Sequence, residues 1–446
     1  MRSPSPSHPS RSARRLQHLQ NRAFAYFKCE TNPANGLVSD KTAPNWPASI
    51  AATGLALAGY PVAVERGMMT AHAAIERTLA TLRFFWNSPQ GEEPDATGYR
   101  GFYYHFLDMQ TGRRVWHCEL STVDSAFLFA GMLAAAAYFG GDSADEREIR
   151  DLADKLYRRA EWPWAQAGDG TIGHGWRPEN GFIPHRWQGY DEGLLLYVLA
   201  LGSPTHPLRR SAYEAWASTY EWKRCYDIDY LYAGPLFTHQ LSHVWIDFRG
   251  IQDDYMRGKG IDYFENSRRA TISQRLYAID NPGEWRDYGA NVWGLTAGDG
   301  PFDTTFVVNG RTRQFFTYRA RGAAAGEIVD DGTIAPTAAG GSVPFAPEIT
   351  IPALIAMREK YGDNLFAAYG FVDDFNPTLI TGASKYGRIV PGIGWFDTDY
   401  LGIDQGPIIA MIENYRSDLI WKTMRKNPYI VAGLRKAGFA GGWLAR

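Results

Sequence analysis

The sequence predicts an all-α protein of the double-layered helical barrel type, with long loops and minor β decoration. Helical segments dominate the 446 residues. Residues 121–139 are apolar almost all round, as expected for a helix that is buried on every side. Residues 144–165 are amphipathic, with Asp, Glu, Lys and Arg on one face. This alternation indicates inner helices surrounded by outer ones.

Sequence signals mark where several helices begin and end. Ser121 precedes an apolar run and has Asp124 three residues later, the pattern of a capping box. Asp145 and Glu146 would charge the first turn of the next helix, and the Gly-Ser-Pro of 202–204 would end a later one. The predicted helices are 15–29, 47–66, 70–87, 121–139, 144–165, 192–201, 207–220, 238–246, 263–279, 347–361, 405–417 and 419–422.

Long loops rich in Gly, aromatic and acidic residues separate these helices. Loops of such length in a compact domain usually carry function, so we expect them to form one wall of a substrate cleft. Short β segments are expected at 101–108 and 315–318. Residues 1–14 are expected to be a disordered leader, and 15–446 a single barrel domain. The long loops are 89–116, 168–189, 225–237, 285–317 and 322–347.

Charge and composition exclude several classes of partner. With 48 acidic and 46 basic side chains, the chain has no basic field for nucleic acid or an anionic membrane. The longest apolar stretches, 48–63 and 126–139, are too short to cross a bilayer. The N-terminus lacks the apolar core of a secretory signal, which predicts a cytoplasmic protein, or a periplasmic one if an export signal was trimmed. The three cysteines suggest neither a disulfide framework nor a zinc module, and no pattern indicates the oligomeric state.

Aromatic side chains are unusually abundant, with 15 Trp, 25 Tyr and 23 Phe. Many lie in polar, Gly-rich segments such as 98–104, 173–187 and 287–293. Flat aromatic rings match the apolar CH faces of sugars and lose little rotamer entropy on binding. The composition therefore favours a carbohydrate-binding protein, while the filling of a large core is the alternative explanation.

Three carboxylates are the candidates for acid–base chemistry on a sugar. Hydrolysis of a glycosidic bond needs a proton donor for the leaving oxygen and a second carboxylate that acts as base or nucleophile. Asp124, Glu192 and Asp404 each lie at a loop-to-helix junction, although each could also be a cap or a partner of the helix dipole. A helix N-terminus favours an ionised carboxylate, which suits Asp404 as the base. Glu192 would need burial or a neighbouring anion such as Asp191 to hold its proton.

Two histidines and an arginine are candidates for holding sugar hydroxyls. His239 and His243 share a helix face, but no HExxH motif or third ligand accompanies them, so no metal site is predicted. Packing in the core is the alternative for both. Arg249, in the string WIDFRG, could grip a sugar or form a buried ion pair.

Other enzyme classes lack their sequence signatures. The chain has no G-x-S-x-G elbow, no Walker loop, and no G-x-G-x-x-G following a strand. Serine-hydrolase and nucleotide-binding functions are therefore not predicted, and no cofactor is expected.

Several strings, taken together and in order, resemble the glucoamylase-like family that includes bacterial endo-β-1,2-glucanases (glycoside hydrolase family 144). The resemblance runs from about residue 16 to residue 439. Related domains occur in cyclic β-1,2-glucan synthases. The strings are GFYYHFLD (101–108), ELSTVD (119–124), LGSPTHP (201–207), GPLF (234–237), DYFENSR (262–268), WGLTA (293–297), DGTIAPTA (331–338) and DQGP (404–407).

This resemblance implies an (α/α)₆ barrel, hydrolysis of β-1,2-glucan to sophoro-oligosaccharides, and no metal. By position, Glu192 matches the family's acid in its Gly-Tyr-x-Glu string, and Asp404 matches the aspartate of Asp-Gln-Gly-Pro. Asp124 matches a further cleft acid. We expect inversion, with Glu192 as the acid and Asp404 as the base on the opposite face of the ring. The candidates to bind neighbouring sugars are Tyr190, Trp176, His239, His243, Arg249, Trp293, Asp299, Glu265 and Arg268.

Two departures from the family pattern are visible. Asp191 and Gly193 stand where the family has Asn and Ala, which alters the surroundings of the acid. The missing export signal favours a short oligosaccharide taken up by the cell as the substrate. The alternatives that stay open are a retaining β-1,2-glucosyl transglycosylase on the same barrel and a non-catalytic glucan-binding protein.

Overall fold

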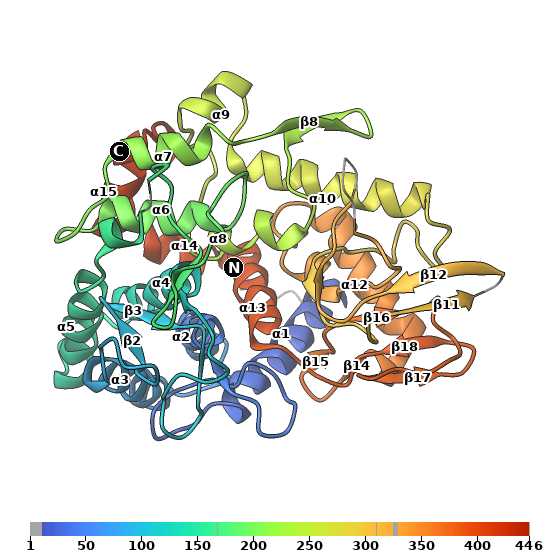
Figure 1. Cartoon of the computed structure of the whole chain (residues 1–446), viewed down its shortest axis with the longest axis horizontal. Helices are drawn as coiled ribbons and strands as arrows, with labels where there is room; N and C mark the ends of the chain where they lie inside the picture. Colours follow the sequence, from blue (N-terminus) through green and yellow to red (C-terminus); the bar gives the residue numbers. More distant parts are fainter. Residues whose placement is uncertain (1–10, 167, 309, 324–328, 446) are drawn as a thin grey trace, which may run out of the picture.

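The computed structural model describes residues 11–166, 168–308, 310–323 and 329–445. The first helix, α1 (Arg11–Cys29), begins four residues earlier than the sequence predicted. Most of the expected leader, residues 1–10, lies outside the described residues. Figure 1 shows the helices arranged around a central region, with the strands in the connections between them.

Within the described residues, six helices form an inner ring, and they are buried almost all round. Neighbours in this ring are in contact, and Gln240, which precedes α8, closes it by donating hydrogen bonds of 2.7 Å to Ala338 and Ser342 around α11. The predicted barrel is therefore confirmed. The inner helices are α2 (Ile50–Glu65), α4 (Thr122–Tyr138), α6 (Gly193–Gly202), α8 (Leu241–Trp245), α11 (Pro336–Gly340) and α13 (Gly402–Ser417).

The outer layer covers this ring with helices that bury one face. In α5, for example, Ile149, Leu152 and Leu156 are buried against the ring, while the charged side chains lie on the solvent-facing side of the helix. The outer helices are α1, α3 (Ala71–Asn87), α5 (Ala144–Arg158), α10 (Tyr263–Asp280), α12 (Pro347–Tyr361) and α15 (Pro428–Lys436). Shorter helices are α7 (Arg210–Ala217), α9 (Asp254–Lys259) and α14 (Leu419–Met424), with 3₁₀ turns at Trp162–Ala165, Leu236–His239, Gly362–Asn364 and Gly442–Ala445.

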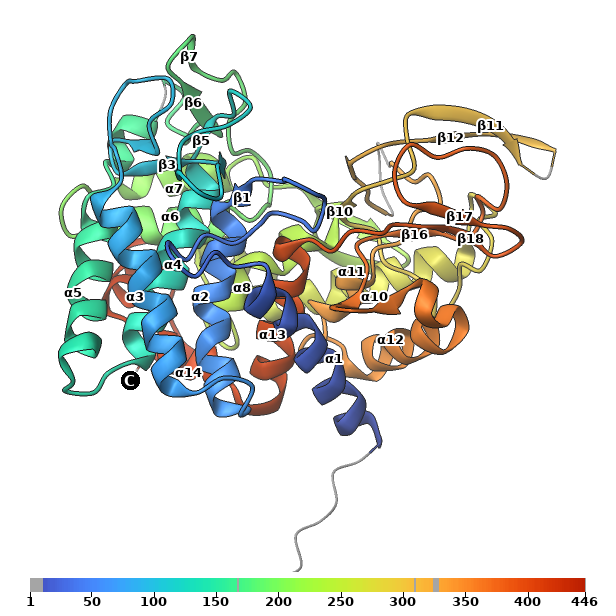
Figure 2. The same ribbon diagram turned by 90° about the horizontal axis from the view of Figure 1, so that it is seen from below.

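Short antiparallel strands decorate the connections, and Figure 2 shows most of them gathered at one end of the helices. A five-stranded sheet has the order β2 (Gly98–Tyr99), β3 (Phe102–Tyr104), β5 (Leu120–Ser121), β6 (Gly175–Arg177), β7 (Gly181–Phe182). A three-stranded sheet has the order β16 (Phe375–Asn376), β18 (Gly394–Phe396), β17 (Arg388–Val390). The remaining pairs are β1 (Ala48–Ser49) with β4 (Phe106–Leu107), β8 (Trp222–Cys225) with β9 (Ile228–Leu231), β10 (Ala297–Gly298) with β13 (Arg319–Ala320), β11 (Thr304–Val308) with β12 (Arg311–Phe315), and β14 (Phe366–Ala367) with β15 (Gly370–Phe371).

Among the described residues, three helices lie outside the segments that the sequence predicted to be helical. The short helices α9 and α11 fall in segments that the sequence assigns to loops, because five or six residues are too few to show a 3.6-residue repeat. The third, α15, has a start signal in Asn427, whose side chain caps the helix before Pro428. The predicted helix 144–165 stops at Arg158, and Pro163 lies in a separate 3₁₀ turn.

Backbone-to-backbone contact at glycines fixes the inner ring. A side chain on Gly54 of α2 would overlap the backbone of Phe127 in α4, and one on Gly131 would overlap Gly54. Gly406 of α13 instead faces the side chain of Leu55 in α2, which occupies the space that a Cβ would take. Only glycine allows helices to approach this closely, so these positions set the spacing of α2, α4 and α13.

No helix in the described part of the chain is long and apolar enough to cross a membrane. The thiols of Cys29, Cys118 and Cys225 are all free.

The close contact at Gly54 predicts a selective loss of stability. Gly54→Ala should lower the free energy of unfolding by roughly 1–3 kcal/mol, because the methyl group must push α2 and α4 apart. Gly59→Ala, in the same helix but with open space at its Cβ, should be neutral or stabilising by up to about 1 kcal/mol. Thermal unfolding of both variants would check this, and equal behaviour would contradict the packing argument.

Candidate active site

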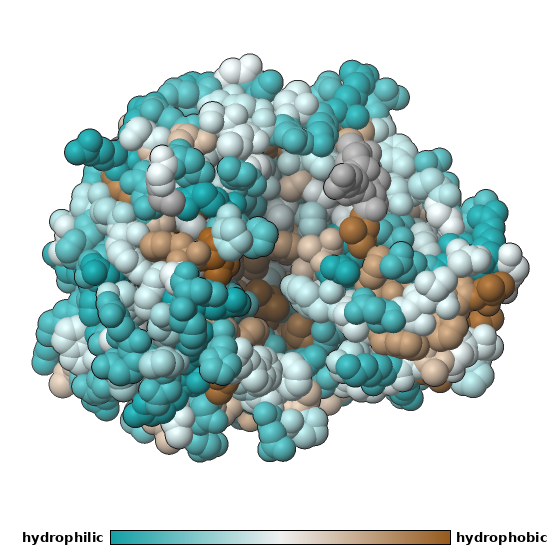
Figure 3. All heavy atoms as spheres, viewed as in Figure 1, coloured by the Kyte–Doolittle hydropathy of each residue, from teal (hydrophilic) through white to brown (hydrophobic). Residues whose placement is uncertain are grey.

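A cavity of about 280 Å³ opens at the N-terminal ends of the inner helices. In Figure 3 a hollow lies near the centre of the visible face, with hydrophobic residues in its depth and hydrophilic ones around it. Asp124 of α4, Glu192 before α6 and Asp404 of α13 all line the cavity, so the structure brings the three predicted carboxylates together. The other lining residues include His105, Glu119, Ser121, Phe127, His174, Trp187, Phe237, Gln240, Tyr318 and Thr337.

Glu192 has the electrostatic surroundings of a proton donor. It is the N-cap of α6, yet its side chain makes no capping hydrogen bond. Burial of the carboxyl and, after it, the negative charge of Asp124 raise the pKa of Glu192 to about 7. Asp191, which the sequence proposed as the neighbouring anion, is buried beside Glu192, and burial followed by the charge of Glu192 raises the pKa of Asp191 well above its ordinary value. Its Oδ1 accepts a hydrogen bond of 2.9 Å from Gly193 N. A Cβ at residue 193 would collide with that Asp191 carboxylate, which explains why glycine accompanies aspartate in this string.

The side chains of Asp124, His105 and Glu119 form a charged relay. His105 Nδ1 lies 3.0 Å from Glu119 Oε1, and its Nε2 lies 3.6 Å from Asp124 Oδ2. Burial alone would lower the pKa of His105, but Asp124, Glu119 and Asp40 outweigh it and raise the pKa to about 9. The imidazolium therefore sits between two carboxylates at neutral pH. Ser121, the N-cap of α4, also hydrogen-bonds the Asp124 carboxylate.

Asp404 lies in the first turn of α13 and faces a group of further aspartates. Burial, followed by the negative charge of Asp373 and then those of Asp374 and Asp299, raises the pKa of Asp404 well above its ordinary value. Burial and these like charges oppose the helix N-terminus, which by itself favours the ionised form of Asp404. Asp404 Oδ2 is buried and has no hydrogen-bond partner among the residues that the structure describes.

The rest of the lining supplies aromatic faces and hydroxyls. Trp187 stacks on His174 with ring centroids 3.9 Å apart, and its indole nitrogen donates to Thr122 at 3.0 Å. Burial lowers the pKa of His174 to about 4, with His185 adding to the effect, so this ring stays neutral. Tyr318 is 58% exposed and lines the cavity beside Asp404, which places a phenol at the mouth. Such a surface suits the alternating CH faces and hydroxyls of a sugar.

Four of the predicted sugar-binding residues are core residues instead. Trp293, His239 and His243 are fully buried, and Tyr190 is 4% exposed. Burial lowers the pKa of His239 to about 4, and its Nε2 lies 3.2 Å from Ala233 O, so packing in the core explains it. None of the four lines the cavity.

Charged candidates from the sequence are engaged in ion pairs away from the cavity. Arg249 pairs with Asp247 at 2.8 Å and lies over the Trp421 ring. Of the two alternatives that the sequence left open, a sugar contact or an ion pair, the structure shows the ion pair. Glu265 binds Arg269 at 2.9 Å. Arg268 binds Glu348 at 2.6 Å.

The last two candidates lie beside the cavity without lining it. Trp176 of β6 stacks on Tyr99, with ring centroids 4.9 Å apart. Asp299 pairs with Lys41 at 2.7 Å and belongs to the aspartate group behind Asp404.

His105 and Glu119 are the residues that sequence reasoning missed. Both stand inside strings that carry the family resemblance, GFYYHFLD and ELSTVD. The sequence predicts a β segment over 101–108, and a lone histidine within it gives no sign of which carboxylates will meet it. Only the pairing of β3 with β5, at Tyr104 and Leu120, brings the two segments together.

Comparisons with known proteins find relatives whose descriptions agree with one another. A family model named Glycoamylase, with the description "putative glucoamylase", matches residues 184–428. A solved "putative glucoamylase" from Bacteroides uniformis is 33% identical, with a TM-score of 0.83 over 98% of this chain and 100% of that one. An endo-β-1,2-glucanase from Chitinophaga pinensis, solved as a complex with sophorotriose and glucose, is 27% identical, with a TM-score of 0.82 over 98% and 100%.

A curated relative is larger than this chain. The exo β-1,2-glucooligosaccharide sophorohydrolase (non-reducing end) from Parabacteroides distasonis is 28% identical over 96% of this chain. The chain spans 58% of the length of that relative.

The raised pKa of His105 predicts a pH-dependent stability. Because folding raises this pKa from 6.5 to about 9, its contribution is complete below pH 6.5 and is lost as the pH rises through 9. Between these values the wild type should lose roughly 1–3 kcal/mol relative to His105→Gln, which cannot titrate. Thermal unfolding across this pH range measures the difference, and parallel curves for the two proteins would refute the relay.

Proposed function

This chain belongs to the glucoamylase-like family whose model it matches, and on that premise we propose that it is a glycoside hydrolase cleaving β-1,2-linked glucan or sophoro-oligosaccharides. The observation that carries the proposal is the meeting of Asp124, Glu192 and Asp404 in one cavity, with an acid of pKa about 7 among them. The β-1,2 linkage comes from the relatives, since two of them are named for action on β-1,2-glucans or their oligosaccharides.

Glu192 is the general acid in this proposal. A carboxyl with a pKa near 7 is largely protonated at mildly acidic pH, so it can give its proton to the leaving glycosidic oxygen as the C–O bond breaks. Its place at the cavity wall, with no capping hydrogen bond, leaves the carboxyl free to reach that oxygen, directly or through a substrate hydroxyl.

Asp404 is the general base. Asp404 lines the cavity and, as the base, takes a proton from a water molecule while the water oxygen attacks the anomeric carbon. Attack on the face opposite the leaving group inverts the configuration, so β-linked substrate yields α-anomeric product. Asp124, beside the His105 imidazolium, is an anionic acceptor for a sugar hydroxyl and also helps Glu192 to keep its proton.

The aromatic lining holds the sugar rings that flank the scissile bond. Trp187, Phe237 and Tyr318 offer faces for stacking, while Gln240 and Thr337 offer polar groups from the ends of two inner helices.

Replacing Glu192 tests the proposal directly. Glu192→Gln should lower kcat on β-1,2-glucan or sophoro-oligosaccharides by about 10²–10⁴-fold, because the amide cannot give up a proton. The matched control is Glu265→Gln, another first-turn glutamate, which should keep activity within about twofold since it pairs only with Arg269. Reducing-end release measures both.

Product analysis of the same reactions separates the alternatives. NMR of the first product should show the α-anomer. A β-anomer with glycerol or glucose adducts would establish a retaining transglycosylase, and saturable binding with no new reducing ends would establish a binding protein.

The pH profile tests the acid assignment independently. Because Glu192 must be protonated, kcat/KM should fall as the pH rises above about 7. Asp124→Asn removes the neighbouring negative charge, so the residual activity of this variant should show the same alkaline limb at lower pH. An alkaline limb that does not move in Asp124→Asn, or a plateau that extends beyond pH 8.5, would remove Glu192 from the acid role.

A further inference from the structure

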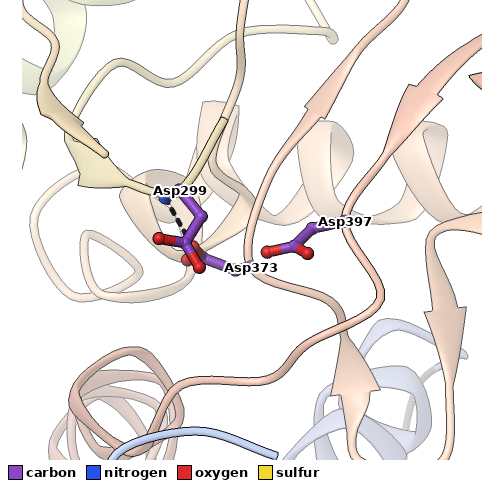
Figure 4. A group of neighbouring side chains, drawn as sticks. All are labelled: Asp299, Asp373 and Asp397. Atoms are coloured by element: carbon purple, nitrogen blue, oxygen red, sulfur yellow. Dashed lines mark hydrogen bonds between the residues drawn. The ribbon is translucent and has the colours of Figure 1, made fainter. Parts of the chain in front are cut away.

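Three aspartates from three different loops converge behind Asp404. Asp299 follows β10, Asp373 follows β15 and Asp397 follows β18. One carboxylate oxygen from each lies within 4.8 Å of the other two. In Figure 4 the Asp397 carboxylate points toward Asp373, whose Oδ2 accepts a hydrogen bond of 2.8 Å from Asp299 N.

Two of these carboxylates are buried and have an oxygen left over. Asp373 is 1% exposed and Asp397 is 2% exposed. Asp373 Oδ1 and Asp397 Oδ2 have no hydrogen-bond partner within the described residues. The other oxygen of Asp397 accepts from the backbone of Thr398 at 2.6 Å, so the side chain is held in place with its free oxygen turned to the group. A buried polar atom without a partner is costly, which points to a missing ligand.

The nearby cations do not balance the negative charge. Lys41 Nζ donates a hydrogen bond of 2.7 Å to Asp299 Oδ2. The other carboxylate oxygen of Asp299 takes no part in that ion pair. Arg321 donates two hydrogen bonds to Asp331, of 2.7 and 3.1 Å, and a longer one of 3.3 Å to Asp374. Asp373 and Asp397 therefore have no basic side chain paired with them among the described residues. Uncompensated buried carboxylates need a counter-ion or protons.

We propose that Asp299, Asp373 and Asp397 bind a calcium ion. Ca²⁺ prefers carboxylate and water oxygens at 2.3–2.6 Å, so two ligands of one ion lie at most about 5 Å apart. The three oxygens here lie within 4.8 Å of one another, which is close enough for all of them to bind one ion. Waters complete the coordination. This proposal differs from the sequence-based expectation of no metal. The ion takes no part in the reaction proposed above.

An ion fits the position better than a sugar hydroxyl does. Asp373 and Asp397 do not line the cavity, and their near-complete burial keeps a sugar ring away from them. Asp299 is more exposed, with 16% of its side chain accessible, and provides the route by which an ion enters. The bound ion would tie the loops after β10, β15 and β18 together and so brace the cavity wall behind Asp404.

Calcium binding is tested on the full chain after treatment with EDTA and removal of the chelator. Isothermal titration with CaCl₂ should give one ion per chain, and Tm should rise by about 3–6 °C at saturating calcium. Sodium chloride at equal ionic strength should leave Tm unchanged. Asp397→Asn should abolish most of the calcium-dependent rise.

The matched control is Asp253→Asn, another buried carboxylate, which is held by Tyr213 at 2.6 Å and Tyr263 at 2.8 Å. It should lower Tm but keep the full calcium-dependent rise. If Asp397→Asn does not fold, Asp299→Asn takes its place, because the more exposed Asp299 is easier to replace. Absence of calcium binding by the wild type, or an undiminished rise in the folded variant, would overturn the site. A Tm that rises with sophoro-oligosaccharide but not with calcium would overturn it as well, whether or not the enzyme is active.

Discussion

The close packing of the inner helices is the constraint on which the rest of the molecule depends. At Gly54 and Gly131 the backbones of α2 and α4 touch, and Gly406 lets the Leu55 side chain of α2 pack directly on α13. With the inner helices packed this closely, the cavity lies at their N-terminal ends. The loops that join the helices can then add side chains around one such end, where the strands also gather (Figure 2).

Convergence of helix N-termini explains both the chemistry of the cavity and its electrostatic problem. Asp124, Glu192 and Asp404 occupy equivalent places at the starts of three inner helices, so the ring brings them together without any contact between them in sequence. Crowded carboxylates repel one another and oppose ionisation. Two features relieve this repulsion. The His105 imidazolium lies between Asp124 and Glu119, and the pKa of Glu192 is raised to about 7, which suits the proton donor proposed above. On the side of Asp404, the proposed calcium ion would supply the missing positive charge.

The helical period gave most of the fold, and the exceptions have physical causes. α4 and α6 are apolar on every face and α5 on one, so their layer could be predicted from burial alone. α11 could not, because Pro336–Gly340 is a single turn that is helical only through its contacts in the ring. In the site, the three acids were found because loop-to-helix junctions are visible in the pattern. Trp293, His239 and Arg249 were misplaced, since an aromatic, a histidine and an arginine look alike in a core and in a cleft.

The sequence by itself determined the class of the protein: a helical double layer, an aromatic-rich chain suited to sugars, and carboxylates at helix starts. These are properties of local periodicity and residue type, which short segments carry on their own. Only the tertiary structure decided that the pKa of Glu192 is raised, that His105 and Glu119 line the cavity, and that Asp299, Asp373 and Asp397 meet. The reason is that a pKa and an ion site depend on distances between groups far apart in the chain, and those distances exist only once the ring has closed.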